Sequence, residues 1–358
     1  MTLTNGPLIE LLNEGCQKGV FSGAQLAFAF EGLPPRIACV GTTQTYQGKP
    51  ISEDTLFDIG SITKTFFTTS VLARLVDKKQ IHLEGPLSQV LPETQTRALA
   101  KLGQLSLSDI LAHASGLAGW LPLYEEPSPS VLDYFRMAPH RVLIHAPRSQ
   151  ALYSDLGFYL LGYALEKSFG PLKELLEKEV TGPLSLTHTG FGPLKPNQSV
   201  ATTEYCLWRK RWLQGEVFDE NTFAHHAQSG AAGLFSTAGD TLVWAEEWRK
   251  ARQGNSPWLS AETANLFTTR SGKTSQSTWA LGWDTPAPQH SSAGKFFSKT
   301  SFGGLGFPGC SVWVDPERDG VVVFHSNRTH PSRFNKQIAS FRPLLHDLII
   351  EQWKSQKH

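Results

Sequence analysis

The stretch of sequence on which the interpretation of the whole chain depends reads Phe57-Asp58-Ile59-Gly60-Ser61-Ile62-Thr63-Lys64-Thr65-Phe66. On a helix, positions i and i+3 share one face, so we expect Lys64 to stand beside Ser61. A serine hydroxyl is a weak nucleophile at neutral pH and needs a base to take its proton. If the pair lies in a desolvated cleft, burial favours the neutral lysine, which can then accept that proton. The spacing therefore predicts Ser61 as a nucleophile and Lys64 as its base.

Taken alone, this short pattern has a second interpretation, because Ser-x-x-Lys occurs by chance, usually as a serine cap followed by a solvated lysine. The surrounding sequence decides between the two. Residues 57–66 closely resemble the nucleophile segment of the class C β-lactamase and penicillin-binding-protein superfamily, and Tyr153-Ser154-Asp155 resembles its second catalytic motif. Three more segments match in the same order, and they are 111–117, 230–238 and 312–316. The resemblance extends over roughly residues 20 to 345.

The resemblance implies roles for two residues of the second motif. Tyr153 is expected to act as a general acid and base with Lys64, which requires a nearby ammonium because a phenol ordinarily titrates near pH 10. The alternative is a packed tyrosine that only satisfies a hydrogen bond. Asp155 is expected to contact substrate and lysine, or to cap the helix predicted at 156–168, and the two roles are compatible. For His113 we expect a structural hydrogen bond within its loop.

The third motif of the superfamily, Lys-Thr-Gly or His-x-Gly, falls on Gly304-Leu305-Gly306. The usual cation or imidazole is thus replaced by Gly304, which has no side chain. Lys299-Thr300-Ser301 resembles the motif but lies too far upstream to serve without a longer turn, so we do not count it. Ala231 stands where related sequences often carry a histidine. These two losses predict weak recognition of a substrate carboxylate.

Acyl transfer does not depend on those side chains. We expect the oxyanion hole to use backbone N–H groups of Ser61 and Phe307, which side-chain changes leave in place. The predicted catalytic residues are therefore Ser61, Lys64 and Tyr153, and the predicted substrate contacts are Asp155, Gly304, Gly306 and Phe307.

The resemblance also implies the fold class, which is α/β (α+β) of the β-lactamase/transpeptidase type: an antiparallel sheet flanked by helices, with an inserted all-helical region. Apolar periodicity agrees with this fold, because it predicts strands near both ends of the chain and helices between them. The predicted strands are 25–30, 36–41, 309–314 and 320–325, and the predicted helices include 61–78, 106–113, 156–168, 240–252 and 335–354. We expect a single domain over residues 1–358, with a sheet region of about 1–60 and 270–358 and a helical region of about 61–270.

Composition excludes several other classes of protein. The 358 residues carry 33 Lys and Arg against 32 Asp and Glu, so the basic field that attracts nucleic acid is missing. No apolar run approaches the roughly 18 residues of a membrane span. Neither the four scattered cysteines nor His225-His226 has the spacing of a metal site, so no metal and no cofactor is expected. We predict a cytoplasmic location, or a periplasmic one if a signal peptide has been removed.

The predicted function is that of a serine hydrolase that forms an acyl-enzyme at Ser61 and hydrolyses a neutral or hydrophobic ester or amide. Its partner is a small-molecule or peptide substrate, and the oligomeric state is not predicted. One alternative is a D-Ala-D-Ala-type carboxypeptidase, another peptidase or a β-lactamase. A second is a non-catalytic protein on the same scaffold, because a fold does not fix a function.

Overall fold

The main sheet of the protein brings together strands from the two ends of the chain. The computed structural model describes residues 5–126, 131–195 and 197–357. Five antiparallel strands lie in the order β2-β1-β10-β9-β8. Their bounds are β1 Gly23–Phe30, β2 Leu33–Gly41, β8 Phe302–Leu305, β9 Ser311–Asp315 and β10 Gly320–Ser326. The predicted antiparallel sheet flanked by helices is therefore confirmed.

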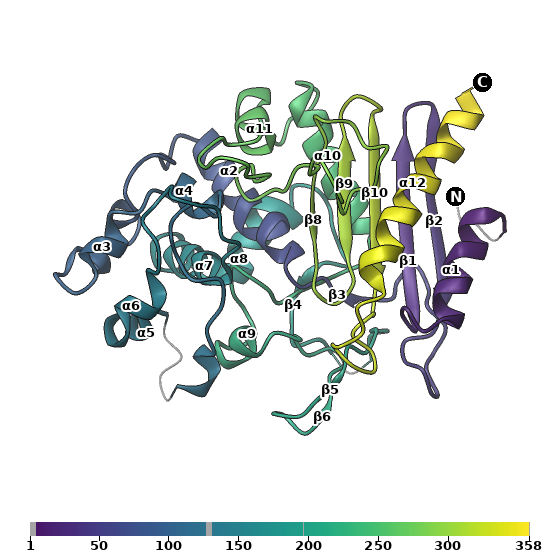
Figure 1. Cartoon of the computed structure of the whole chain (residues 1–358), viewed down its shortest axis with the longest axis horizontal. Helices are drawn as coiled ribbons and strands as arrows, with labels where there is room; N and C mark the ends of the chain where they lie inside the picture. Colours follow the sequence, from purple (N-terminus) through teal and green to yellow (C-terminus); the bar gives the residue numbers. More distant parts are fainter. Residues whose placement is uncertain (1–4, 127–130, 196, 358) are drawn as a thin grey trace.

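Both faces of this sheet are covered, as Figure 1 shows. Helices α1 (Pro7–Gln17) and α12 (Ile338–Lys357) pack on one face, and α10 (Ala238–Arg252) packs on the other. Alternate side chains of a strand point to opposite faces. Leu26 and Phe28 accordingly join the core under α1 and α12, whereas Ala27 and Ala29 join the larger core on the α10 side. Burial on both sides explains why β1 is apolar along nearly its whole length.

The long segment between β3 (Phe57–Asp58) and β8 supplies the helices at the left of Figure 1 and also α10, which covers the main sheet. Its α-helices are α2 Ser70–Asp77, α3 Ala100–Gly103, α4 Leu107–Leu111, α5 Val131–Met137, α6 Pro139–Val142, α7 Asp155–Phe169, α8 Leu172–Leu176, α9 Glu220–Ala224, α10 and α11 Ala261–Thr268. Short helical turns are η1 Lys64–Thr69, η2 Leu87–Gln89, η3 Pro92–Gln95, η4 Leu123–Glu125 and η5 Glu177–Thr181.

The same segment also holds short strands that the sequence did not predict. β7 (Leu234–Ser236) pairs with β3 on one side and with β4 (Gly190–Phe191) on the other, in the order β3-β7-β4. β5 (Tyr205–Cys206) and β6 (Arg211–Trp212) form a separate hairpin that projects from the lower side of Figure 1. Two-residue strands leave almost no periodic signal, so the sequence pattern could not separate them from loops.

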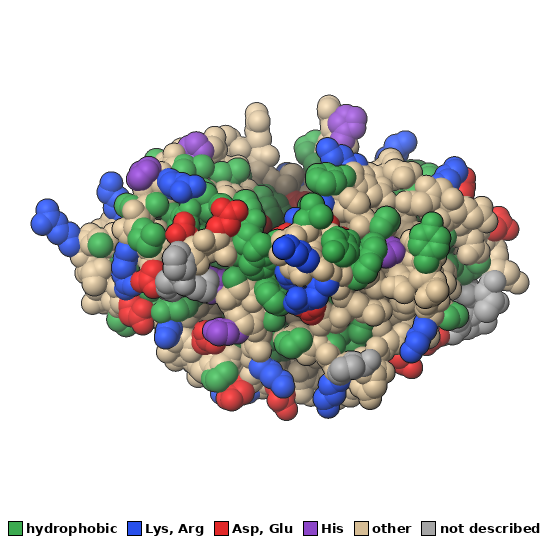
Figure 2. Space-filling model, turned by 90° about the horizontal axis from the view of Figure 1, so that it is seen from below, with side chains coloured by type: hydrophobic (Ala, Val, Ile, Leu, Met, Phe, Trp, Pro, Cys, Tyr) green, Lys and Arg blue, Asp and Glu red, His purple; other side chains and the backbone are tan. Residues whose placement is uncertain are grey.

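The lower side of the molecule carries exposed apolar side chains. Figure 2 shows hydrophobic side chains gathered near the middle of this face, with Lys and Arg side chains among them. The β5–β6 hairpin contributes the exposed Leu207, Trp208 and Trp212. Within the residues that the structure describes, no helix is both long enough and apolar enough to cross a bilayer.

Candidate active site

A tight turn after β3 carries Ser61. Gly60 has a φ of 52°, a left-handed conformation that favours glycine, and a Cβ there would lie only 2.5 Å from Cδ of Pro308. The chain then becomes helical and continues as η1, a π-helical segment that precedes α2. The sequence predicted one regular helix over 61–78, so the wide turn of η1 corrects that prediction. Such turns are rare and frequently occur at functional sites.

The buried ammonium of Lys64 makes three polar contacts. Its Nζ lies 2.9 Å from Oγ of Ser61, 3.0 Å from the carbonyl oxygen of Ala231 and 2.7 Å from Oδ1 of Asp155. Burial opposes the charge, but attraction to the Asp155 carboxylate outweighs it, so the pKa of Lys64 is raised. We expected burial to favour the neutral amine. Burial does act in that direction, but the expectation left out the carboxylate beside the lysine, which reverses the net shift of the pKa.

Asp155 is free to pair with Lys64 because its neighbour caps the helix. Oγ of Ser154 accepts a hydrogen bond from the backbone N–H of Gly157 at 3.1 Å, which makes Ser154 the N-cap of α7. The alternative role of Asp155 as the cap is therefore wrong, and Asp155 is the first residue of the helix. The backbone N–H of Ser154 in turn donates to Nδ1 of His113 at 3.0 Å.

Tyr153 lies between His113 and the Ser61–Lys64 pair. The His113 ring packs 4.6 Å from the Tyr153 ring, centroid to centroid, and burial lowers the pKa of His113 to about 3. His113 is therefore a neutral structural group, as predicted. Nζ of Lys64 lies 5.2 Å from the centroid of the Tyr153 ring, and the Tyr153 hydroxyl interacts with both Lys64 and Ser61. Burial and the charge of Asp155 raise the pKa of this phenol despite the nearby ammonium, so Tyr153 is protonated at neutral pH.

Two backbone N–H groups border the nucleophile. In the described part of the chain, neither the N–H of Ser61 nor that of Phe307 donates to an acceptor. The Phe307 nitrogen lies beside the Ser61 turn, since a Cβ on Gly60 would be 3.1 Å from it. Gly306 permits this approach, because a Cβ there would lie 2.2 Å from the carbonyl oxygen of Ile59. Both donors are therefore available to a ligand oxygen near Ser61.

Ser61 opens into a cavity of about 380 Å³. Its lining residues are Asp58, Gly60, Ser61, Lys64, Trp120, Tyr153, Asp155, Tyr159, Phe218, Asp219, Glu220, Ala231, Ala232, Phe307, Pro308 and Arg333. The structure thus brings Ser61, Lys64, Tyr153, Asp155 and Phe307 together. Gly304 and Gly306 lie on and just after β8 rather than in this lining, and a Cβ on Gly304 would point toward Thr65 Oγ1 at 3.7 Å. Lys299 lines a different cavity, in agreement with our decision not to count it.

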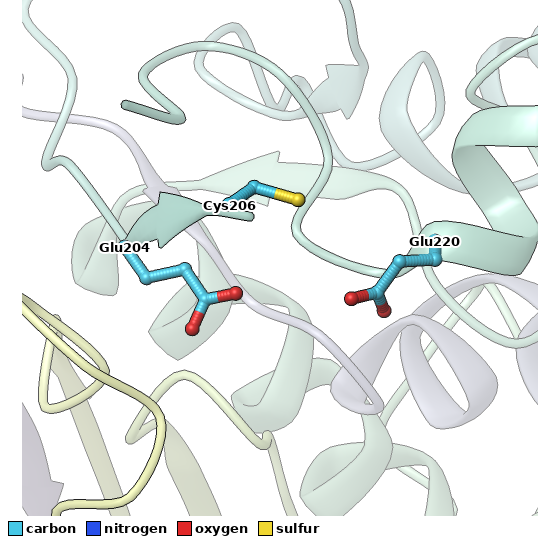
Figure 3. Close-up of side chains that lie close together, drawn as sticks. All are labelled: Glu204, Cys206 and Glu220. Carbon is cyan, nitrogen blue, oxygen red and sulfur yellow. The ribbon is translucent and has the colours of Figure 1, made fainter. Parts of the chain in front are cut away.

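The sequence did not reveal a charged cluster at the edge of this cavity. Figure 3 shows the carboxylates of Glu204 and Glu220 directed toward each other, with Cys206 nearby. Arg333 binds both carboxylates: its Nε lies 3.0 Å from each oxygen of Glu204, and its Nη2 lies 2.5 Å from Oε1 of Glu220. An ion pair thus accounts for the cluster, and we assign it no metal. No local pattern could have linked residues so far apart in the sequence.

Comparisons with known proteins agree with this geometry. The family model described as Beta-lactamase matches residues 15–344, so the chain belongs to the beta-lactamase family. Like the hydrolases of this family, it is a serine hydrolase.

Two relatives illustrate the range of names within the family. A protein of Escherichia coli (strain K12) named as a D-alanyl-D-alanine carboxypeptidase is 29% identical over 330 residues, which cover 81% of this chain and 74% of that protein. A protein of Bacillus subtilis (strain 168) named N-acetylmuramyl-L-alanine amidase is 30% identical over 348 residues, covering 87% and 78%.

Solved structures support the fold. EstCE1, described as a hydrolase with promiscuous acyltransferase activity, superposes with a TM-score of 0.72 at 22% identity, over 94% of this chain and 97% of that one. A class C beta-lactamase superposes with a TM-score of 0.70 at 18% identity, over 94% of each chain. At such identities the likeness establishes the fold alone, and the particular activity must be argued from the site.

Proposed function

We propose that the chain hydrolyses a neutral or hydrophobic ester or amide through an acyl-enzyme at Ser61. Oγ of Ser61 attacks the carbonyl carbon while its proton passes to Nζ of Lys64, which gives a proton to Asp155. This route is supported by the continuous contacts of Lys64 with Ser61 and Asp155. The Lys64 charge is constant throughout, so the step does not require a neutral lysine at rest.

The remaining groups act in the two steps of the reaction, which are acylation of Ser61 and hydrolysis of the acyl-enzyme. The N–H groups of Ser61 and Phe307 stabilise the oxyanion. The hydroxyl of Tyr153 protonates the leaving group as the bond to the carbonyl carbon breaks, and it recovers a proton from Asp155 through Lys64. Water then attacks the acyl-enzyme, gives a proton to the same path and releases the acid, while Ser61 recovers its own proton.

One observation carries the choice of substrate class: among the described residues that line the cavity, no cation lacks a carboxylate partner, so none is free to bind a substrate carboxylate. Gly304 has no side chain, and Ala231 offers only a methyl group and a carbonyl oxygen that Lys64 already binds. The two cationic side chains of the cavity, Lys64 and Arg333, are both paired with carboxylates. Penicillins and D-Ala-D-Ala peptides present a carboxylate that needs such a partner. The aromatic residues of the cavity instead offer apolar surface.

Two alternatives stay open. The names of the relatives favour a carboxypeptidase or amidase that acts on peptide-like substrates. The losses at Gly304 and Ala231 motivate a non-catalytic scaffold, but the close contacts of Ser61, Lys64 and Asp155 argue against it.

The test is intact-mass spectrometry of wild type and Ser61→Ala after exposure to a fluorophosphonate probe and, separately, to a labelled penicillin. We expect an adduct with the fluorophosphonate only, and only in the wild type. An adduct with both probes would mean that the pocket still recognises a carboxylate. No adduct with either, in a protein that melts cooperatively, would favour the non-catalytic scaffold.

A further inference from the structure

The active-site cavity has more negative than positive side chains. Among the described residues that line it, four are carboxylates and two are cationic. Lys64 is paired with Asp155, and Arg333 is paired with Glu220 and, behind the lining, with Glu204. The two cations of the lining are therefore already matched, and the lining side chains carry more negative than positive charge. Two further guanidinium groups, Arg209 and Arg328, lie behind the lining, where they bind the backbone carbonyl oxygens of Phe218 and Phe307.

Neither of the other two carboxylates of the lining forms an ion pair with a described residue, although the charge of Arg209 acts on Asp58 from a distance. Asp58 accepts backbone hydrogen bonds from Gly60 at 2.8 Å and Phe218 at 2.6 Å, and Asp219 accepts from the Tyr159 hydroxyl and from a backbone N–H of α9. Hydrogen-bond donors stabilise these charges but do not cancel them. A cavity lined by one excess sign of charge concentrates ligands of the opposite sign.

Glu220 is the carboxylate that can bind a ligand directly. It is the first residue of α9, its side chain is 13% exposed, and it lines the cavity. Oε1 of Glu220 pairs with Arg333, whereas Oε2 has no hydrogen-bond or ion-pair partner among the described residues. Arg333 also forms an ion pair with Glu204, so one guanidinium is shared by the two carboxylates that Figure 3 shows.

The walls of the cavity point to the same class of ligand by an independent route. Aromatic rings with exposed surface line it, since Trp120 is 47% and Tyr153 38% exposed, whereas the Phe307 ring already has the Arg328 guanidinium 4.3 Å from its centroid. The face of an aromatic ring attracts a cation within about 6 Å, and ammonium ligands are commonly bound in this way. A carboxylate oxygen beside aromatic faces is therefore a suitable environment for an organic ammonium group.

We propose that the substrate of this hydrolase carries an ammonium group, which the Glu220 carboxylate and the aromatic walls of the cavity bind. The proposal rests on the acyl transfer at Ser61 that the proposed function describes. It refines the substrate class, because the ester or amide that Ser61 attacks stays neutral while a separate part of the same molecule carries the positive charge. Glu220 is a specificity-determining residue in this scheme. It acts through the charge of the substrate, away from the carbonyl that Ser61 attacks.

The experiment compares substrates that differ only in charge. In the acyl series, p-nitrophenyl 4-(trimethylammonio)butanoate is compared with its neutral isostere p-nitrophenyl 5,5-dimethylhexanoate and with the anionic mono-p-nitrophenyl ester of glutarate. In the leaving-group series, butyrylcholine is compared with 3,3-dimethylbutyl butyrate. We expect kcat/KM to favour the cation over its neutral isostere by about tenfold in at least one series, and to be lowest for the anion. This preference should decrease as ionic strength rises.

Two variants locate the preference. Glu220→Gln removes the charge, so the cation-to-neutral ratio should fall several-fold. Glu216→Gln is the matched control, because Glu216 pairs with Arg211 and lies outside the cavity, and its ratio should stay at the wild-type value. A wild-type preference that survives Glu220→Gln would overturn the assignment to Glu220.

The outcomes separate this proposal from the proposed function. If every neutral ester is hydrolysed in a Ser61-dependent way but neither series favours the cation, the ammonium proposal is wrong and the proposed function stands. A preference for glutarate would refute both the ammonium proposal and the exclusion of carboxylates. If none of the esters is hydrolysed, the proposed function itself fails.

Discussion

Gly304→Lys should restore recognition of an anionic acyl group. A Cβ at this position would meet only Thr65, with Oγ1 at 3.7 Å and Cγ2 at 3.8 Å, which are ordinary van der Waals distances. The backbone of Gly304 is not left-handed, and it pairs with Val312 of β9. A side chain therefore fits without moving the strand. The Cβ of the new side chain would point toward Thr65, which follows Ser61 by four residues.

The size of the effect follows from the interaction that the lysine adds. A hydrogen bond to a charged group contributes about 1.5–3 kcal/mol. Each 1.4 kcal/mol is a tenfold change, so the ratio of kcat/KM for an anionic ester to that for its neutral counterpart should rise about 10- to 100-fold. The excess negative charge of the cavity works against this gain, so the lower end of the range is expected.

The assay compares hydrolysis of mono-p-nitrophenyl glutarate and p-nitrophenyl 5,5-dimethylhexanoate by wild type, Gly304→Lys and Gly304→Gln. The glutamine variant adds a neutral side chain of comparable length and controls for lost space. Fluorophosphonate labelling of Ser61 reports that each variant keeps a working nucleophile. If lysine and glutamine give the same anion-to-neutral ratio while both variants are labelled, position 304 does not control carboxylate recognition.

Two further predictions concern carboxylates of the active-site cavity, Asp155 and Asp58. Asp155→Asn removes the attraction that outweighs burial, so the pKa of Lys64 should fall. A 13C NMR titration of the lysine Cε signal, assigned with Lys64→Met, should show a lower midpoint in this variant than in wild type. An unchanged or higher midpoint would contradict the ion-pair interpretation. Burial raises the pKa of Asp58 from 3.8 to about 6. Between about pH 4 and 6 the folded state therefore keeps a proton on Asp58 that the unfolded state has released. The contribution of Asp58 to stability is lost as the pH rises through this range. Asp58→Asn should abolish that dependence in the difference between the melting curves of the two proteins. A pH dependence of stability between about pH 4 and 6 that is the same in both proteins would refute this prediction.

Much of the fold could be predicted because it is encoded in local patterns. Apolar runs marked both the N-terminal strands and the C-terminal hairpin, since strands buried on two faces are apolar almost throughout. Helix periodicity placed α7 and α10 to within two residues of the predicted starts. The π-helical turn η1 and the two-residue strands β4 to β6 escaped prediction, because they are too short or too irregular to impose a period on the sequence.

The sequence by itself determined the family and the pairing of Ser61 with Lys64, because a three-residue spacing on a helix fixes which side chains are neighbours. Only the tertiary structure decided the charges around that pair. Asp155 raises the pKa of Lys64, and Glu204 and Glu220 occupy Arg333, through contacts between residues far apart along the chain. Electrostatic interaction depends on distance in space and on burial, and neither quantity is written in the local order of residues.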